Sequence, residues 1–499
     1  MAIEHVDVLI VGAGVSGIGA ACHLARECPD KTYLVLERRS RMGGTWDLFR
    51  YPGIRSDSDM FTFGYNFRPW HETKVLADGP SIQRYVAETA AEYGVDEHIR
   101  YGMQVLKASW STDDGRWTVE ARDAATRRRK RFTAGFLIAC TGYYNYDQGY
   151  RPEFPGEADF TGPIIHPQHW PDELDYRGKK VVVIGSGATA VTLVPAMAED
   201  AGHVTMLQRS PSYVLSLPAV DGISERLRRV LPDSVVFRMA RRRNIGLQRA
   251  LYGISKSRPS AMRSLLLKLA QRQLGGAFDP KHFSPKYNPW DQRMCIVPDA
   301  DLFKTIRSGR ADIVTDRIER FTPTGIRLAS GDELEADIIV TATGLNVQML
   351  GGAEMEIDGA PIAVNEALTY KSVMLEGVPN ATIVFGYTNA SWTLKADLAC
   401  EYTCRLLNHM DAHGYSQAVA HATAADRGTG SVLDSLTSGY VRRAADRLPR
   451  QGLRPPWRVR NDYLCDVPVL RFGAIEDGVL EFSRVAARDA ASPRPSVPA

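Results

Sequence analysis

Short runs of β-branched and aliphatic residues recur along the chain, each followed by glycine and then by apolar positions at helical spacing. Residues 8–11 and 32–36 flank such a helical segment at 18–25. The same order returns at 179–194, with a further strand at 203–208. A buried strand, a glycine turn, a helix and a second strand make the βαβ unit of a parallel sheet. We therefore predict an α/β fold with two Rossmann-like dinucleotide-binding domains.

The first unit carries Gly12-x-Gly14-x-x-Gly17 directly after its strand. These glycines permit a tight turn, close approach of a pyrophosphate and packing of the helix on the strand. The next strand ends at Glu37, where a carboxylate can accept a hydrogen bond from an unphosphorylated ribose. This unit predicts FAD binding.

The second unit carries Gly185-x-Gly187-x-x-Ala190, and its next strand ends in Arg209 and Ser210. Arg209 stands where the first unit has its carboxylate. A carboxylate would repel a ribose 2′-phosphate, whereas a guanidinium binds it in a bidentate manner. The charge reversal predicts NADPH at the second unit.

Strand-then-Thr-Gly turns at 136–142 and 338–344 mark the places where the chain changes domain. They predict that the chain leaves the FAD domain, builds the NADPH domain and returns. The first part of the FAD domain is expected at 1–145. The NADPH domain is expected at 146–340, with a helical insertion at about 222–290. The chain then returns to the FAD domain and a C-terminal segment at 341–485, and a disordered tail follows at 486–499.

The amino-acid composition serves only to exclude some classes of function and of site. A hydrophobic content of 44% and a charged content of 24% are ordinary for a globular protein, and a net charge of +3 does not argue for nucleic acid. The seven cysteines form no Cys-x-x-Cys pair, so no zinc ribbon or thioredoxin-like motif is predicted. The N-terminus has no leader pattern, and no apolar run is long enough to span a bilayer. We expect a cytoplasmic protein.

Two charged residues are candidates for the chemistry. A turn at 51–53 delivers Asp57, and a proline-containing loop at 287–295 carries Arg293. A carboxylate from one domain and a guanidinium from another could meet over a flavin ring. On composition alone, two unrelated surface charges remain the simpler interpretation.

The ordered set of motifs resembles type I Baeyer–Villiger monooxygenases. The first glycine motif is followed by Gly43-Gly-x-Trp46-x₄-Tyr51-Pro-Gly-x₃-Asp57, by Phe160-x-Gly162-x₃-His166-x₃-Trp170-Pro171 and by the second glycine motif. Segments 47–59, 142–146, 287–293 and 386–397 are similar to the branch that contains the ethionamide-activating monooxygenase. The resemblance extends from about residue 5 to 470.

This resemblance implies that NADPH reduces FAD, that oxygen then gives a flavin C4a-peroxide, and that the peroxide converts a hydrophobic ketone into an ester or lactone. Arg293 matches the family's catalytic arginine, whose charge would stabilise the peroxyanion. Asp57 matches the carboxylate that orients it. Sulfides are expected as secondary substrates.

The expected cofactor-binding set follows the same motifs. Many family members have lysine before the catalytic arginine, whereas this chain has Gln292, so NADPH preference would depend mainly on Arg209 and Ser210. The expected cofactor-binding residues are Gly12, Gly14, Ser16, Gly17, Glu37, Gly44, Thr45, Trp46, Arg55, Asp57, Val105, Gly185, Ser186, Gly187, Ala188, Thr189, Ala190, Arg209 and Ser210.

The segment 160–171 contains His166 and His169 in a His-x-x-His spacing. A metal site needs further ligands, and the acidic residues that follow are common surface types, so no metal site is predicted. We expect the segment to be the joint between the domains, with His166 coupling domain movement to NADPH positioning. The expected coupling residues are Phe160, Gly162, His166 and Trp170.

Residues 225–274 hold thirteen Lys/Arg against two Asp/Glu, with apolar residues at helix-like spacing. Two interpretations stay open: a solvated helical face, or an amphipathic surface that contacts an anionic membrane.

Two other functions compete with the ketone-oxidising one. A flavin N- or S-oxygenating monooxygenase shares both glycine motifs, but it typically lacks the Trp-Pro ending of the linker motif and the catalytic arginine. A non-enzymatic NADPH-binding sensor would have no need of Arg293 and Asp57. We therefore expect an enzyme.

Overall fold

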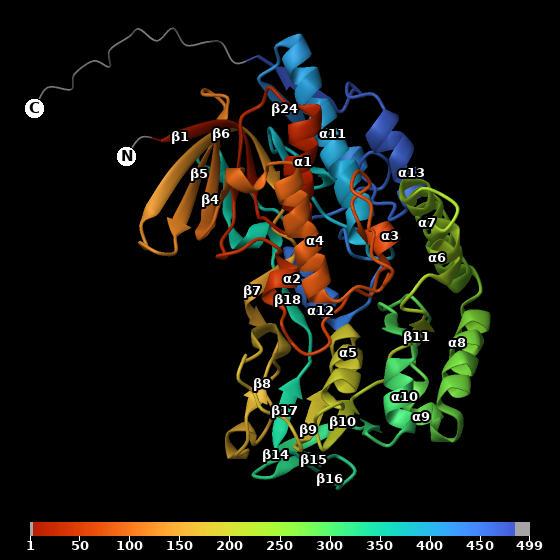
Figure 1. Ribbon diagram of the computed structural model, residues 1–499. Helices are drawn as coiled ribbons and strands as arrows, with labels where there is room; N and C mark the ends of the chain where they lie inside the picture. The colour runs from red at the N-terminus through yellow and green to blue at the C-terminus, as the bar shows by residue number, and fades with distance from the viewer. Residues whose placement is uncertain (1–2, 485–499) are drawn as a thin grey trace, which may run out of the picture.

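The computed structural model describes residues 3–484 (Figure 1), so the predicted tail at 486–499 lies outside the described residues. Two sheets organise the described chain. In the first, the strand order is β20-β19-β4-β5-β6-β1-β2-β3, with β23 beside β6. Its strands are β1 (Glu4–Val11), β2 (Tyr33–Leu36), β3 (Ile99–Arg100), β4 (Met103–Ser111), β5 (Arg116–Asp123), β6 (Arg129–Ala139), β19 (Glu354–Ile357), β20 (Ala360–Pro361) and β23 (Ala381–Ile383).

The side chains of β1 contribute alternately to two hydrophobic cores, because successive side chains of a strand point to opposite faces of the sheet. Val8 and Ile10 join the helices on one face, and Leu9 joins the β4–β5–β6 meander on the other, which includes Trp110 and Trp117. The helices packed against this domain are α1 (Val15–Glu27), α2 (Thr45–Leu48), α3 (Met60–Phe63), α4 (Gly79–Glu92), α11 (Trp392–His413), α12 (Gly439–Ala444) and α13 (Tyr463–Val467).

The second sheet is parallel throughout, in the order β13-β10-β9-β17-β8. Val181 and Val183 of its central strand are buried against α5, which has the apolar sequence expected of a helix covering a parallel sheet. Its elements are β8 (Ile164–Ile165), β9 (Lys180–Ile184), β10 (His203–Gln208), β13 (Ala311–Thr315), β17 (Ile338–Thr341), α5 (Ala188–Met197) and α10 (Asp301–Arg307). The predicted α/β fold with two Rossmann-like cores is confirmed.

The two sheets are connected by two strands that run side by side. β7 (Tyr144–Gly149) leaves the first sheet, β18 (Leu345–Val347) returns to it, and they pair antiparallel. The predicted boundary at 146 falls within β7, and the boundary at 341 falls at the last residue of β17. The second domain is thus inserted into the first.

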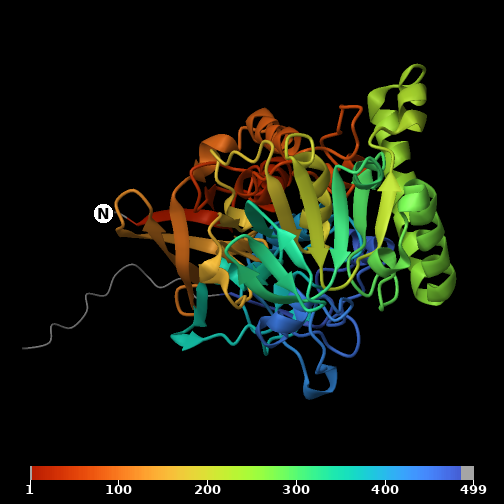
Figure 2. The same ribbon diagram turned by 90° about the horizontal axis from the view of Figure 1, so that it is seen from below.

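A helical insertion follows β10 and lies along one edge of the molecule (Figure 2). It is closed at its base by β11 (Val214–Leu217) and β12 (Cys295–Pro298), which pair parallel. No helix among residues 3–484 is long and apolar enough to cross a membrane. The helices of the insertion are α6 (Gly222–Arg228), α7 (Asp233–Ser257), α8 (Pro259–Leu274) and α9 (Pro280–Phe283).

Small sheets complete the described chain. A β14–β15–β16 meander extends the second domain, and β24 and β25 form a two-stranded antiparallel sheet near the C-terminal end of the described chain. These strands are β14 (Ile318–Thr322), β15 (Gly325–Leu328), β16 (Glu333–Glu335), β21 (Thr369–Tyr370), β22 (Met374–Leu375), β24 (Gln417–Ala420) and β25 (Leu480–Ser483).

Candidate functional site

The first glycine turn brings α1 against the end of β6. Gly12 has φ of +102°, and a Cβ there would lie 2.6 Å from the Cys140 carbonyl oxygen. Only glycine tolerates both the backbone conformation and the close approach. The turn therefore leaves the N-terminus of α1 open towards a cavity.

That cavity has an empty volume of about 590 Å³. Glu37 lies on its wall, 4% exposed, and accepts hydrogen bonds from the backbone N–H groups of Ala13 at 2.7 Å and Arg39 at 2.8 Å. Burial raises the pKa of Glu37, and the two N–H groups counter that rise. Five predicted cofactor residues line the cavity: Gly12, Gly14, Glu37, Gly44 and Val105.

Further predicted residues surround the start of α1. The Ser16 hydroxyl accepts a hydrogen bond from Nε1 of Trp392, at 2.7 Å, which ties α1 to the first turn of α11. Trp46 packs edge-on against Phe63, with ring centroids 5.7 Å apart. Thr45 begins α2, directly after Gly44. These side chains cluster within the first domain, but their role towards a cofactor stays a prediction.

Arg293 and Asp57 come together between the domains. The guanidinium Nη1 lies 3.8 Å from Oδ2 of Asp57, and Nη2 donates to the Tyr387 carbonyl oxygen at 3.4 Å. Burial opposes the charge of Arg293, yet the Tyr143 hydroxyl and the Asp57 carboxylate raise the pKa of the guanidinium. Its Nε is buried and finds no hydrogen-bond partner within residues 3–484. The site thus presents a fixed positive charge with a spare donor.

The loop that supplies Asp57 is docked onto the second domain. Gly53 lies so close to α5 that an added Cβ would be 2.7 Å from the Ala196 side chain. In the same loop Arg55 donates through Nη1 to Asp301 at 2.5 Å. Its Nε and Nη2 are buried with no partner in the described chain. Two unsatisfied donors beside the second sheet are suited to an anionic ligand.

The second glycine turn repeats the geometry of the first. Gly185 has φ of +143°, and a Cβ there would lie 2.3 Å from the Ala342 carbonyl oxygen. A Cβ added at Gly187 would meet no atom of the described chain within 4 Å, so a phosphate can approach. The Ser186 hydroxyl donates to the Ser210 carbonyl at 2.9 Å, and Arg209 is exposed. No carboxylate of residues 3–484 pairs with Arg209, which leaves its guanidinium available. The remaining predicted residues, Ala188, Thr189 and Ala190, form the first turn of α5.

The segment 160–171 lies on the two connecting strands. His166 Nε2 donates to the Gly344 carbonyl at 3.1 Å, while its Nδ1 accepts from the Gln168 backbone at 3.2 Å. His169 lies 3.1 Å from the Asp147 carbonyl. Burial lowers the pKa of His166, which favours the neutral ring. Both histidines therefore bond to backbone of the crossing segments, consistent with a joint.

The other coupling residues hold this joint against the second domain. Phe160 is buried and packs edge-on against Phe321, with centroids 6.4 Å apart. Gly162 approaches the backbone so closely that a Cβ would lie 2.2 Å from the Asp337 carbonyl oxygen. Trp170 is half-buried against the core of the second domain.

A second cavity, of about 560 Å³, lies beside Arg293 and is mostly apolar. Tyr387 links Arg293 to this cavity, because its carbonyl accepts a hydrogen bond from Arg293 and the residue lines the cavity. The Tyr387 hydroxyl and Nζ of Lys395 both donate to Oδ2 of Asp466, at 2.7 and 2.8 Å. The motif at 386–397 covers Tyr387 and Lys395, but nothing in the sequence pattern indicates Asp466. The apolar lining of this cavity includes Met349, Val373, Met374, Phe385, Val432 and Val459.

The sequence is similar to known flavoproteins over nearly its whole length. Residues 5–390 match the family model described as flavin-binding monooxygenase-like. The putative FAD-containing monooxygenase MymA of Mycobacterium tuberculosis is 58% identical, over 98% of this chain and 100% of that protein. The FAD-containing monooxygenase EthA of the same organism is 54% identical, over 96% of this chain and 98% of that protein.

Among solved structures, an oxidized steroid monooxygenase bound to NADP has a TM-score of 0.70 and 22% identity, covering 84% of this chain and 88% of that one. At this identity the match supports the fold. The family match spans most of the chain, and both sequence relatives are aligned over nearly their full length. The chain belongs to the flavin-binding monooxygenase-like family, which confirms the predicted class of enzyme.

Proposed function

We propose that this protein is an FAD-dependent, NADPH-consuming Baeyer–Villiger monooxygenase that inserts one oxygen atom from O₂ into a hydrophobic ketone to give an ester or lactone. The observation that carries the proposal is the Arg293–Asp57 pair at 3.8 Å, which joins the two domains and is linked to an apolar cavity through Tyr387. A flavin oxygenase acting only on nitrogen or sulfur has no evident use for this pair.

The residues present fit both cofactors. The cavity at the first turn, with Glu37 on its wall, suits an unphosphorylated ribose and a pyrophosphate. Arg209 and Ser210 suit a 2′-phosphate, and the spare donors of Arg55 suit a further phosphate oxygen. When bound, the flavin supplies the electrons and the activated oxygen for the reaction.

Arg293 supplies the electrostatic part of the chemistry. Its unpartnered Nε and fixed charge would stabilise negative charge that develops on oxygen during attack on the ketone. Asp57 holds the guanidinium in place from the opposite domain, so the constellation is complete only when the domains are closed. The Tyr387 carbonyl holds a second point of the guanidinium, because it accepts a hydrogen bond from Nη2.

The apolar cavity that Tyr387 links to Arg293 supports a hydrophobic substrate. Its aliphatic and aromatic lining would accept the hydrocarbon part of a ketone, leaving the carbonyl towards the guanidinium. Tyr387 and Lys395 both donate hydrogen bonds to Asp466, so the charges of Lys395 and Asp466 compensate each other. The three residues therefore form a rigid polar wall of the cavity rather than an uncompensated charge. A thioether of similar shape would fit the same cavity, so we expect sulfoxidation as a side activity.

The test separates flavin reduction from oxygen transfer. Arg293→Ala should still allow NADPH to bleach the flavin, but ester formation should fall by about 10²- to 10³-fold, the usual cost of one such electrostatic donor. Asp57→Asn should give a smaller loss, because it acts through Arg293. Product analysis over a panel of ketones and thioethers measures both, with the exposed Arg258→Ala as a matched control. Undiminished ester formation by Arg293→Ala would refute the assignment.

We also propose that the helical insertion contacts an anionic membrane surface, from which apolar substrates would be drawn. Large apolar side chains are exposed on it, including Val230 at 77%, Leu247 at 61% and Ile254 at 48%. Of the thirteen basic residues at 225–274, seven are exposed and pair with no carboxylate of the described residues: Arg226, Arg229, Arg238, Arg242, Arg258, Lys268 and Arg272. Interleaved apolar and cationic groups suit anionic headgroups above acyl chains.

A further inference from the structure

The last turns of α11 carry two histidines four residues apart. His409 and His413 therefore lie on the same face of the helix, one turn from each other. Their ring centroids are 4.2 Å apart. Two imidazoles at this spacing can bind one ion together, as in helical His-x-x-x-His metal sites.

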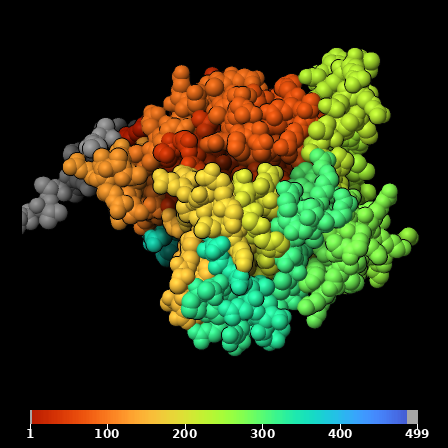
Figure 3. All heavy atoms as spheres, turned by 60° about the horizontal axis from the view of Figure 1, so that its bottom comes forward, coloured from red at the N-terminus to blue at the C-terminus, as the bar shows by residue number. Residues whose placement is uncertain are grey.

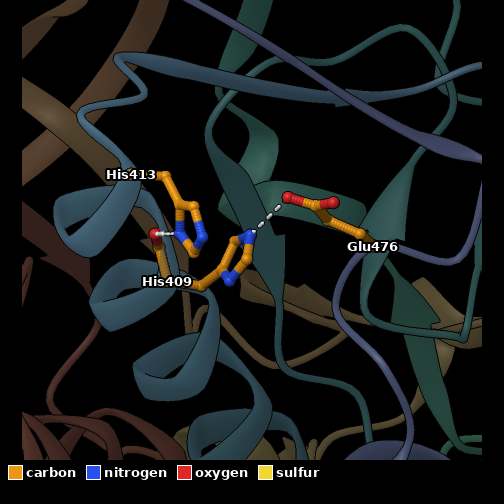
Figure 4. A group of neighbouring side chains, drawn as sticks. All are labelled: His409, His413 and Glu476. Carbon is orange, nitrogen blue, oxygen red and sulfur yellow. Dashed lines mark hydrogen bonds and ion pairs between the residues drawn. The ribbon is translucent and has the colours of Figure 1, made fainter.

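A carboxylate from another segment completes the group (Figure 4). Glu476 lies in the loop before β25, and its Oε1 is 3.0 Å from Nε2 of His409. One potential ligand atom from each of the three residues lies within 4.8 Å of the other two. Tetrahedral bonds of about 2.0–2.1 Å place ligand atoms roughly 3.4 Å apart, so rotation of these surface side chains would close the site.

The hydrogen bonds around the rings favour a ligand role. Nδ1 of His413 lies 2.9 Å from the His409 backbone carbonyl, to which it can donate. In the neutral ring that bond directs the free lone pair to Nε2, the arrangement usual for metal-binding histidines. Figure 4 shows this second nitrogen on the side of the ring that faces His409.

Aromatic side chains pack beside both rings. Tyr415 stacks on His413 with centroids 5.6 Å apart, and Phe482 contacts both Tyr415 and His409. The guanidinium of Arg484 donates a hydrogen bond to the His413 carbonyl oxygen at 2.8 Å. The group is thus partly ordered before any ion arrives.

We propose that His409, His413 and Glu476 bind a divalent transition-metal ion of the zinc type, with water in the remaining position. Imidazole and carboxylate ligands suit Zn²⁺, Ni²⁺ or Cu²⁺ rather than Ca²⁺ or Mg²⁺. The ion would clamp the end of α11 to the loop before β25. The helix is 22 residues long, roughly 33 Å, so the ion would lie far from Trp392 at its other end and serve structure. The inference does not depend on the proposed monooxygenase chemistry.

The experiment is titration of tag-free holoenzyme with Zn²⁺ by calorimetry, together with the visible absorption of bound Co²⁺. We expect one ion per chain, and a rise in the thermal unfolding midpoint on adding Zn²⁺. His409→Ala and His413→Ala should each weaken binding at least 10-fold, and Glu476→Gln should weaken it less. Flavin content and flavin reduction should remain unchanged in all three.

His421→Ala is the matched control, because His421 is also a surface histidine, 3.9 Å from Glu481, but belongs to no such cluster within residues 3–484. It should leave the affinity unchanged. Absence of a stoichiometric ion, binding that survives His409→Ala and His413→Ala, or equal losses in His421→Ala would each overturn the proposal.

Discussion

At the scale of single residues, the two glycine turns differ in the charge of the side chain at the end of the following strand, and in our proposal the choice of cofactor depends on this difference. Glu37 is buried and its carboxylate already accepts hydrogen bonds from two backbone N–H groups, so a phosphate beside it would be repelled by a negative charge that has no free donor to share. Arg209 is exposed and unpaired among residues 3–484, so it can rotate to a phosphate at little cost. Cofactor preference therefore depends on very few atoms.

Arg209→Ala should raise the KM for NADPH by about 10- to 100-fold, because hydrogen bonds to charged groups contribute about 1.5–3 kcal/mol. The KM for NADH should change little, since it carries no 2′-phosphate. Steady-state flavin reduction with each nucleotide measures the difference. Ser210→Ala, which keeps the Ser186 hydrogen bond to the backbone, serves as the milder comparison. Equal changes for both nucleotides would contradict this position for the 2′-phosphate.

Individual site residues are predictable where a motif fixes their spacing. The glycines, Glu37 and Arg209 follow from strand ends, and Arg293 meets Asp57 as the cross-domain contact that the sequence suggests. Asp466 is not predictable, because its partner Lys395 is brought to it by the packing of α13 on α11. A tertiary contact of this kind corresponds to no periodicity or fixed spacing in the sequence.

At the scale of elements, a buried ionic cluster joins three helices. His23 of α1 lies 2.7 Å from Glu27 and 3.5 Å from Asp397 of α11, and Arg241 of α7 lies 3.5 Å from the same Asp397. Burial works against the imidazolium, yet the two carboxylates outweigh it and raise the pKa of His23 to about 9. The ring is therefore charged at neutral pH although it is almost fully buried.

A histidine whose pKa is raised on folding stabilises the protein below its unfolded pKa of 6.5, and that stability is lost as the pH rises through about 9. The shift corresponds to a free energy on the order of 3 kcal/mol. The thermal midpoint of the wild type should therefore fall between about pH 7 and about pH 9.5, more steeply than that of His23→Gln. Calorimetric scans at matched ionic strength measure both slopes. Parallel slopes would show that His23 does not carry the charge.

The strongly patterned elements are predictable, and the loosely patterned ones are not. Predicted strands at 8–11, 32–36 and 203–208 lie within or next to β1, β2 and β10, because each is a short apolar run beside a turn. The region from 420 to 484 has short helices and turns held by side-chain hydrogen bonds, such as Thr423 with Asp426. Such contacts produce no hydrophobic periodicity in the sequence from which these elements could be predicted.

At the scale of the whole molecule, charge is distributed unevenly. The chain has 61 Lys/Arg and 58 Asp/Glu, but residues 225–274 of the insertion alone have thirteen against two, so the remainder has an acidic excess. Figure 3 shows residues of the insertion protruding at one edge. The molecule therefore has a charge asymmetry that would orient it near a negative surface, with the insertion foremost.

Arg242→Glu should weaken binding to vesicles of mixed phosphatidylglycerol and phosphatidylcholine by about fivefold or more, since each basic residue near an anionic surface contributes about 1 kcal/mol. Leu247→Asp should also weaken it, through loss of apolar insertion. Co-sedimentation at physiological salt measures the bound fraction. The exposed Arg177→Glu, outside the insertion, is the control for net charge. No binding by the wild type, or equal loss in the control, would contradict the membrane proposal.

The antiparallel pairing of β7 with β18 has a consequence for how such molecules can be recombined. Entry and exit of the second domain lie side by side, so the inserted segment leaves and rejoins the first domain at adjacent points of the backbone. A domain of this kind can be exchanged as one module, cut at Tyr144–Gly149 and at Leu345–Val347, without rethreading the host sheet. Chimeras with a relative would need to preserve the contacts of His166 with these strands and the cross-domain pairs Arg293–Asp57, Arg55–Asp301 and Arg241–Asp397. Nucleotide preference and ketone preference could then be inherited from different parents.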